Sequence, residues 1–147
     1  MLILGSLPGE RSLAEARYYA HPQNRFWHLV GTVIGADLLA LAYPDRLATL
    51  RAHNIGLWDV LASAKRTGSL DAAIREPVAN PLRDLTSTLP ALRAVAFNGA
   101  TAARVGIKLL SGSDFALVPL PSSSPAFAAM PMAQKQQAWM GLRKFLD

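Results

Sequence analysis

Apolar residues follow two kinds of pattern along the chain, and each pattern predicts a different element. Short, mainly apolar runs predict buried strands at residues 1–4, 55–58, 93–97 and 115–118. Apolar residues spaced three or four apart predict helices at residues 24–35, from about 44 to 51, at 82–89, at 100–110 and from 131 onward. Residues 65–81 show no clear period, so we predict a long loop with one helical turn near residues 71–74.

This alternation of strands and helices predicts an α/β fold. The expected architecture is a three-layer α/β/α sandwich with a central, mainly parallel four-stranded sheet. Residues 1–147 are expected to form a single domain. Because the chain begins inside the first predicted strand, we expect a short N-terminal segment to be missing.

In folds of this kind, ligands bind beyond the carboxyl ends of the strands. The loops that follow the four predicted strands there are rich in Gly, Pro, Ser or Asn: residues 5–9, 58–59, 98–99 and 119–125. Because all four loops share this composition, we predict a binding site at this edge of the sheet.

Composition and charge narrow the class of protein. Fifteen Lys and Arg residues against ten Asp and Glu give a net charge of +5, which favours a nucleic-acid partner, although a basic surface alone is the plainer explanation. The absence of cysteine excludes disulfides, thiolate metal sites and a cysteine nucleophile. Neither a signal peptide nor an apolar run of the roughly 18 residues that span a bilayer is present, so we expect a cytoplasmic protein with no membrane partner.

The densest group of polar and aromatic side chains lies between residues 5 and 27. A turn after the first strand would present backbone amides to a ligand; it consists of Gly5, Ser6, Leu7, Pro8 and Gly9. Tyr18 and Tyr19 offer faces on which a base can stack, or they pack in the core. Asn24 either orients a water or a base, or caps the helix that begins at residue 25, and the two roles are compatible.

Further candidates follow the other strands. Asp59, after Trp58, either accepts a hydrogen bond from a base edge or caps a turn, and Asn98 either reaches the same pocket or only forms an Asn-Gly turn. Phe127 is either a wedge for the base stack or a core residue. The candidates for DNA backbone contacts, with structural or solvated positions as the alternative, are His21, Lys65, Arg66, Arg75, Ser122, Ser123 and Ser124.

Residues 5–27 resemble the first motif of the uracil-DNA glycosylase superfamily, in which a glycine-proline-glycine loop precedes Asn-x-Phe-Trp. The form Gly-Ser-x-Pro-Gly, followed by Tyr-Tyr-Ala-His-Pro-x-Asn-x-Phe-Trp, is similar to the hypoxanthine-acting branch in particular. The resemblance extends over essentially the whole chain through residues 56–61, 68–74, 97–99 and 120–126.

The resemblance implies a monofunctional DNA glycosylase that hydrolyses the bond between a flipped, deaminated base and its deoxyribose. Hypoxanthine is the favoured base and uracil the second. The implied partner is DNA at the nucleoid, the implied state is a monomer, and neither a cofactor nor a metal is implied. Asn24 would be catalytic. Many relatives carry Asn or Asp where Leu7 stands, and that side chain handles the water. Leucine cannot do so, and the resemblance therefore implies that Asn24 or another residue takes this role.

Two other interpretations remain. A non-catalytic relative that binds damaged DNA or a nucleotide is favoured by Leu7 and by a serine loop without histidine. A serine hydrolase using Ser6 or Ser122 would need a base and an orienting acid, and no Gly-x-Ser-x-Gly elbow is present. A phosphate-binding NTPase is disfavoured because the sequence has no P-loop motif.

Overall fold

Four parallel strands form the central sheet of the computed structural model, which describes residues 1–146. Their order across the sheet is β2-β1-β5-β6, with bounds β1 (Leu2–Gly5), β2 (Gly56–Asp59), β5 (Ala94–Asn98) and β6 (Ala116–Leu120). Every residue of the two central strands, β1 and β5, is buried. This is why both strands are continuous apolar runs: a parallel sheet covered on both faces exposes neither side of its inner strands.

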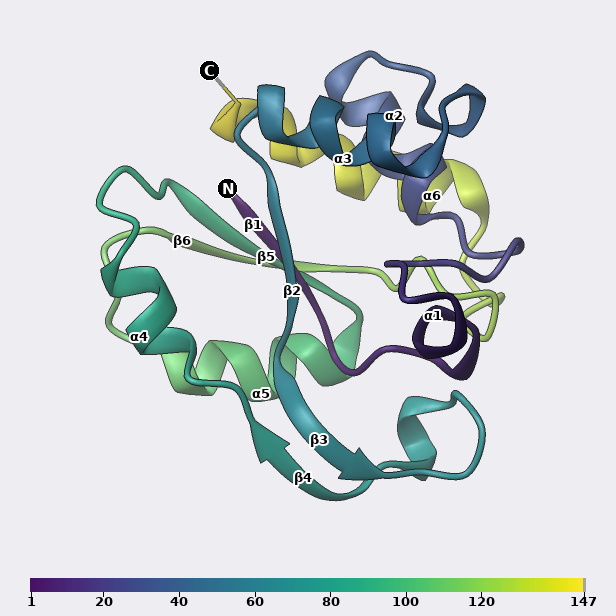
Figure 1. The fold of residues 1–147 in the computed structure, drawn as a ribbon. Helices are drawn as coiled ribbons and strands as arrows, with labels where there is room; N and C mark the ends of the chain where they lie inside the picture. Colours follow the sequence, from purple (N-terminus) through teal and green to yellow (C-terminus); the bar gives the residue numbers. More distant parts are fainter. Residues whose placement is uncertain (147) are drawn as a thin grey trace.

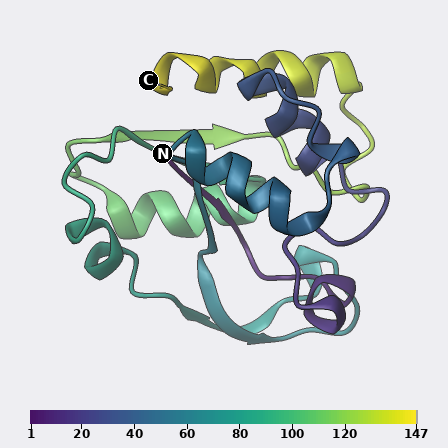
Figure 2. The ribbon, with the colours of Figure 1, turned by 45° about the horizontal axis from the view of Figure 1, so that its top comes forward.

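Helices cover both faces of the sheet (Figures 1 and 2). On one face lie α2 (Phe26–Ile34), α3 (Tyr43–Ala52) and α6 (Met132–Met140), and on the other lie α4 (Leu82–Ser87) and α5 (Ala100–Leu110). The described residues also form three 3₁₀ turns: η1 (Leu38–Ala40), η2 (Asp71–Ala73) and η3 (Gly141–Phe145). The predicted three-layer α/β/α sandwich is therefore confirmed.

The sheet separates two apolar cores. Ile3 points to the face of α2 and α6, where Phe26 and Trp139 meet edge to face at 5.9 Å. Leu4 and Phe97 belong to the other core, beneath α5. Because neighbouring residues of a strand point to opposite faces, Ile3 and Leu4 each anchor a different layer.

Three elements correct the sequence prediction. Residues 65–81 are not one long loop, because β3 (Leu61–Lys65) and β4 (Arg75–Ala79) form an antiparallel hairpin around η2. A short helix, α1 (Glu10–Glu15), follows residue 9 and was not predicted. In these three elements only Leu61 is buried, so they carry no apolar stripe from which a period could be recognised. The predicted helical turn near residues 71–74 is confirmed by η2.

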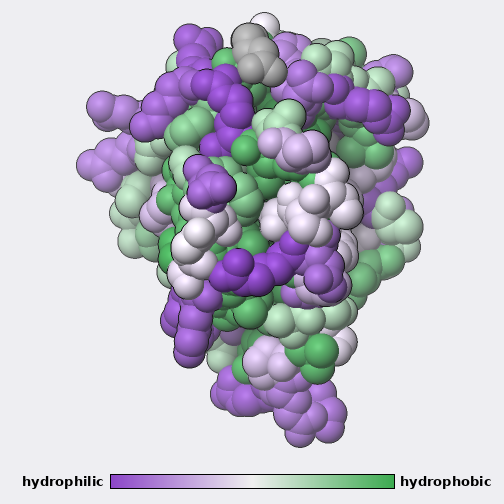
Figure 3. All heavy atoms as spheres, turned by 90° about the vertical axis from the view of Figure 1, so that its left-hand side faces the viewer, coloured by the Kyte–Doolittle hydropathy of each residue, from purple (hydrophilic) through white to green (hydrophobic). Residues whose placement is uncertain are grey.

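The carboxyl ends of the four strands point away from the end of the molecule shown in Figure 3, where hydrophilic side chains lie around the margin and also across the middle. Over residues 1–146, no helix has the length and apolar character needed to cross a membrane. The same residues hold no group of three or more His, Cys, Asp or Glu side chains arranged to take a metal ion.

Candidate active site

A cleft of about 710 Å³ opens at the carboxyl ends of the strands. Its walls come from the loop after β1 and α1, the tip of the β3–β4 hairpin, the start of α5 and the loop after β6. The predicted residues that line it are Gly5, Ser6, Leu7, Pro8, Gly9, Tyr18, Tyr19, His21, Asn24, Asp59, Asn98, Ser122, Ser123, Ser124 and Phe127. The fold thus brings together most of the side chains that the sequence singled out.

The side-chain oxygen of Asn24 already accepts two hydrogen bonds. The backbone N–H of Phe26, the first residue of α2, donates one at 2.9 Å, and the hydroxyl of Ser123 donates the other at 2.8 Å. The bond from Phe26 is an Asx turn that leads into α2, whose N-cap position is occupied by Arg25, so the predicted N-cap role of Asn24 is wrong. The two donors occupy both lone pairs of the Asn24 oxygen. Within residues 1–146 the NH₂ group of Asn24 has no partner. Because Asn24 lines the cleft, a ligand there can accept hydrogen bonds from this NH₂ group but cannot donate to the occupied oxygen.

Asn98 holds the serine loop against the sheet. Its Nδ2 donates to Ser123 Oγ at 2.8 Å, and its Oδ1 accepts from the Ser123 backbone N–H at 2.9 Å. A buried relay therefore runs from the end of β5 through Ser123 to Asn24. Ser123 is only 1% exposed, so its hydroxyl serves this relay instead of the outer surface of the loop.

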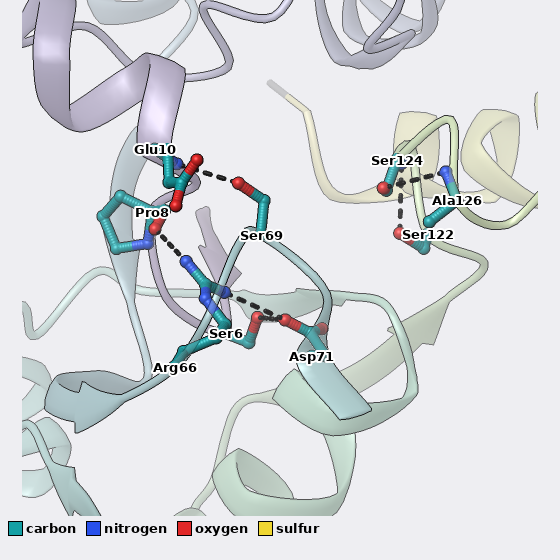
Figure 4. Close-up of polar contacts among 9 residues, drawn as sticks. All are labelled: Ser6, Pro8, Glu10, Arg66, Ser69, Asp71, Ser122, Ser124 and Ala126. Carbon is teal, nitrogen blue, oxygen red and sulfur yellow. Dashed lines mark hydrogen bonds and ion pairs between the residues drawn. The ribbon is translucent and has the colours of Figure 1, made fainter. Parts of the chain in front are cut away.

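The two neighbouring serines shape the rest of that loop. Ser122 Oγ accepts from the backbone N–H of Ser124 at 3.1 Å, and Ser124 Oγ accepts from that of Ala126 at 3.2 Å (Figure 4). Farther along the loop Phe127 is 39% exposed, so its ring lies at the cleft and not in the core. The ammonium of the buried Lys135 holds it there by donating to the Phe127 carbonyl at 2.6 Å.

The two tyrosines occupy different environments. The ring of Tyr19 stacks on that of Phe26 with centroids 3.8 Å apart, so one face of the Tyr19 ring packs against the core. Tyr19 also lines the cleft. Its hydroxyl is buried beside Asn98 without forming a hydrogen bond of normal geometry, and burial raises its pKa. Tyr18 is half-buried, and burial, together with Asp59 and Tyr43, raises the pKa of its hydroxyl.

Asp59 places a carboxylate at the floor of the cleft, at the end of β2. Among the described residues, no donor bonds to this carboxylate. Burial raises its pKa to about 6, against a lowering effect of Arg66 and with a further rise from Asp71. A Cβ at Gly5 would lie 2.7 Å from Asp59 Oδ1 and 3.1 Å from the Tyr19 hydroxyl, so only glycine fits beneath these two groups.

The hairpin tip is tied to the loop after β1 by polar contacts (Figure 4). Ser6 Oγ donates to Asp71 Oδ1 at 2.7 Å, and the backbone N–H of Glu10 donates to Ser69 Oγ at 2.9 Å. Arg66 donates to the Pro8 carbonyl and lies 3.7 Å from Asp71. We call this set of contacts the hairpin latch, and it fixes one wall of the cleft.

Several cleft residues were missed from the sequence: Arg17, Tyr43, Ser69 and Asp71. Ser69 and Asp71 lie within residues 68–74, where the family resemblance was the available signal. Arg17 and Tyr43 had none, because only the fold brings them to the cleft.

Three residues predicted for the site do not line the cleft. Trp58 packs against the core beneath α5, and Lys65 pairs with Glu76 at 2.8 Å on the exposed hairpin. The side chain of Arg66 is only 5% exposed and serves the hairpin latch, unlike a solvated phosphate ligand. Arg75, a further candidate, donates to the backbone carbonyls of Ala72 and Ile74.

This fold and cleft match a known family. The family model of the uracil DNA glycosylase superfamily matches residues 1–143, and the chain belongs to this superfamily. It is 43% identical over 126 residues to the hypoxanthine DNA glycosylase of Methanosarcina acetivorans, covering 86% of this chain and 79% of that protein. It is 46% identical over 99 residues to the hypoxanthine DNA glycosylase of Methanosarcina barkeri, and this match covers 67% of this chain and 63% of that protein.

A solved structure supports the same assignment. A solution NMR structure from Methanosarcina acetivorans, described as a candidate uracil DNA glycosylase, has a TM-score of 0.86 to this chain at 38% identity. The match covers 97% of this chain and 88% of the other. The family resemblance noted in the sequence is confirmed.

Proposed function

We propose that the protein is a DNA glycosylase that removes a deaminated base from DNA and leaves an abasic site. Hypoxanthine is the favoured base and uracil the second. The observation that carries the proposal is Asn24, whose oxygen is fixed by two donors and whose free NH₂ group lines a cleft of about 710 Å³. The two hypoxanthine DNA glycosylases at 43% and 46% identity support this choice of base.

The chemistry needs little from a general base. Hydrolysis of an N-glycosidic bond passes through an oxocarbenium-like transition state, in which the bond from C1′ to the base nitrogen breaks as water approaches C1′. The electron pair of the broken bond goes to the leaving base. A fixed donor near that base stabilises the growing negative charge. The Asn24 amide fits this role, because its oxygen is engaged and its N–H groups are not.

Asp59 suits the recognition of deaminated bases. Hypoxanthine and uracil carry a ring N–H where adenine and cytosine carry a bare nitrogen. An ionised carboxylate accepts a hydrogen bond from the former pair and repels the lone pair of the latter. Within residues 1–146 no donor bonds to the Asp59 carboxylate, which lines the cleft, so the lactam N–H of a bound base would supply its missing hydrogen bond.

The other residues of the cleft would hold the flipped nucleotide. Tyr19 lines the cleft and would stack on the base, while Phe127 is exposed at the cleft and would serve as a wedge that fills the gap in the duplex. We propose that the DNA is single- or double-stranded and that the protein acts as a monomer on chromosomal DNA at the nucleoid.

The test is a single-turnover assay on duplexes with one deoxyinosine or one deoxyuridine, followed by alkali to break abasic sites. Wild type is compared with Asn24→Ala and with Asn24→Asp, which keeps the acceptor oxygen and replaces the NH₂ group. Cleavage at deoxyinosine that both variants lose supports the proposal. Full activity of Asn24→Asp contradicts the donor role, and cleavage at deoxyuridine alone contradicts the choice of hypoxanthine.

One alternative is favoured by a specific observation. Leu7 lines the cleft where many relatives carry a polar side chain, which favours a relative that binds damaged DNA without cutting it. Folded protein that binds both duplexes and cleaves neither would establish this alternative. We do not propose the serine hydrolase, because the Ser6 hydroxyl donates to Asp71, and Ser122 accepts a bond within its own loop.

A further inference from the structure

A second cavity of about 230 Å³ lies beside the cleft. Four residues line both spaces and form the partition between them: Arg17, Tyr18, Tyr19 and Tyr43. The remainder of the second cavity comes from Glu15, Ala20, Trp27 and residues at the start of α3, including Arg46. A nucleotide in the cleft would therefore have this cavity as its direct neighbour.

Two arginines are stacked on the aromatic side chains of this cavity. The guanidinium carbon of Arg17 lies 5.2 Å from the ring centroid of Tyr43, and that of Arg46 lies 5.5 Å from the ring of Trp27. Tyr43 and Trp27 meet edge to face at 5.9 Å, so the four side chains form one continuous group. A guanidinium held by its face keeps its edge N–H groups for a ligand.

The group is anchored to the residue beside the proposed stacking tyrosine. The Tyr43 hydroxyl accepts from the backbone N–H of Tyr18 at 2.9 Å, and Trp27 Nε1 donates to the Tyr18 carbonyl at 3.3 Å. The positions of the two arginines are therefore linked to that of the proposed base-stacking face of Tyr19.

Neither arginine is neutralised by a carboxylate. Across residues 1–146 Arg17 and Arg46 form no ion pair, and the Arg17 side chain forms no hydrogen bond. Arg46 donates from Nε and Nη2 to the carbonyls of Leu41 and Leu39, which leaves its Nη1 donors. Glu15 also lines the cavity, but its carboxylate pairs with Arg11 at 2.8 Å.

We propose that Arg17 and Arg46 form a phosphate subsite that binds a phosphodiester of the DNA strand next to the flipped nucleotide. This inference rests on the proposed function, because it takes DNA as the ligand. A flipped nucleotide carries its own backbone to the edge of the cleft, and Arg17, which is exposed and lines both spaces, can offer its guanidinium to a phosphate there. The Arg17 guanidinium, which forms no hydrogen bond within residues 1–146, can bind a phosphate bidentately, and the Nη1 donors of Arg46 can add a further contact.

The test is the salt dependence of binding to a duplex with one tetrahydrofuran abasic analogue, which the enzyme cannot cleave. Loss of one phosphate contact lowers the slope of log K against log salt by about 0.9. We expect this decrease and weaker binding for Arg17→Gln and for Arg46→Gln, whereas Arg17→Lys keeps the charge and most of the slope. The control is Arg51→Gln, an exposed arginine of α3 that lines neither cavity and should keep the wild-type slope.

The outcomes separate this inference from the proposed function. A wild-type slope for Arg17→Gln, or an equal loss for Arg51→Gln, overturns the phosphate subsite even if deoxyinosine is cleaved. A slope that depends on Arg17, in a protein that cleaves neither deoxyinosine nor deoxyuridine, supports the subsite and overturns the glycosylase. Circular dichroism of each variant shows whether it is folded, and failure of wild type to bind any duplex overturns both.

Discussion

The hydroxyl of Ser123 donates a 2.8 Å hydrogen bond to the side-chain oxygen of Asn24, although 99 residues separate them in the chain. The same hydroxyl accepts from Asn98, so one buried serine joins α2, β5 and the loop after β6. The orientation of the Asn24 amide therefore depends on a residue that need not touch the substrate.

Ser123→Ala should lower both stability and activity. The substitution leaves the buried Asn98 amide without its hydroxyl acceptor and removes one of two donors to Asn24, at a cost of about 1–3 kcal/mol. Urea unfolding and single-turnover cleavage of deoxyinosine measure the two effects. Ser122→Ala is the matched control, because Ser122 Oγ serves only a bond within its loop; equal losses in both variants would contradict the relay.

Gly5→Ala should abolish most activity. The new Cβ would lie 2.7 Å from Asp59 Oδ1, so the carboxylate must leave its position at the floor of the cleft. Gly141→Ala is the control, since a Cβ there meets nothing within 4 Å, and its stability should be unchanged or slightly higher. A Gly5→Ala enzyme that cleaves deoxyinosine at the wild-type rate would show that the place of the Asp59 carboxylate is unimportant.

Asp59→Asn should stabilise the protein at high pH only. The folded pKa of Asp59, about 6, exceeds its ordinary value of 3.8, so the folded state binds the proton more tightly than the unfolded chain. Ionisation of Asp59 therefore lowers the free energy of unfolding as pH rises from about 4 through 6. The loss is at most about 3 kcal/mol, because the carboxylate lines the cleft and solvent there screens its charge. Below pH 4 both states are protonated and the penalty disappears.

Urea unfolding of wild type and Asp59→Asn at pH 4 and pH 8 measures this difference. We expect similar unfolding free energies at pH 4 and a more stable variant at pH 8. A difference that does not change with pH would mean that the Asp59 pKa is not raised. Because the proposed recognition needs the carboxylate, Asp59→Asn should also lose its preference for deoxyinosine over deoxyadenosine in binding.

Asp71→Ala should loosen the wall of the cleft. It removes the acceptor of the Ser6 hydroxyl and the carboxylate nearest to the buried Arg66 guanidinium, so the hairpin latch loses two contacts. We expect a loss of about 1–3 kcal/mol in unfolding free energy and slower cleavage. Glu76→Ala is the control, since its pair with Lys65 is exposed on the same hairpin and contributes about 0–1 kcal/mol.

The sequence was informative where one local interaction decides the structure. Strands β1 and β5 were predicted because burial on both faces requires a continuous apolar run. A contact of Asn24 with the start of α2 was also predicted, although as an N-cap and not as the turn that forms, because its partner Phe26 is two residues away. In these cases the prediction needed only the pattern of neighbouring residues and the contacts between them.

The contacts that complete the site were not predicted, because they join distant segments. Ser6 meets Asp71 across 65 residues, and Asn98 meets Ser123 across 25. Arg66 was a candidate for a DNA phosphate, with solvated surface charge as the alternative, whereas the fold places its guanidinium against Pro8 and Asp71. A single sequence carries no pattern that pairs these residues.

The long reach of the Ser123 bond has a consequence for the order in which the site is assembled. During synthesis, Asn24 leaves the ribosome 99 residues before Ser123 does. A nascent or truncated chain therefore holds the base-binding loop without the residue that orients its amide. Competence to act on DNA would arise in one late step, when the last strand joins the sheet, and incomplete chains would be inactive toward the genome.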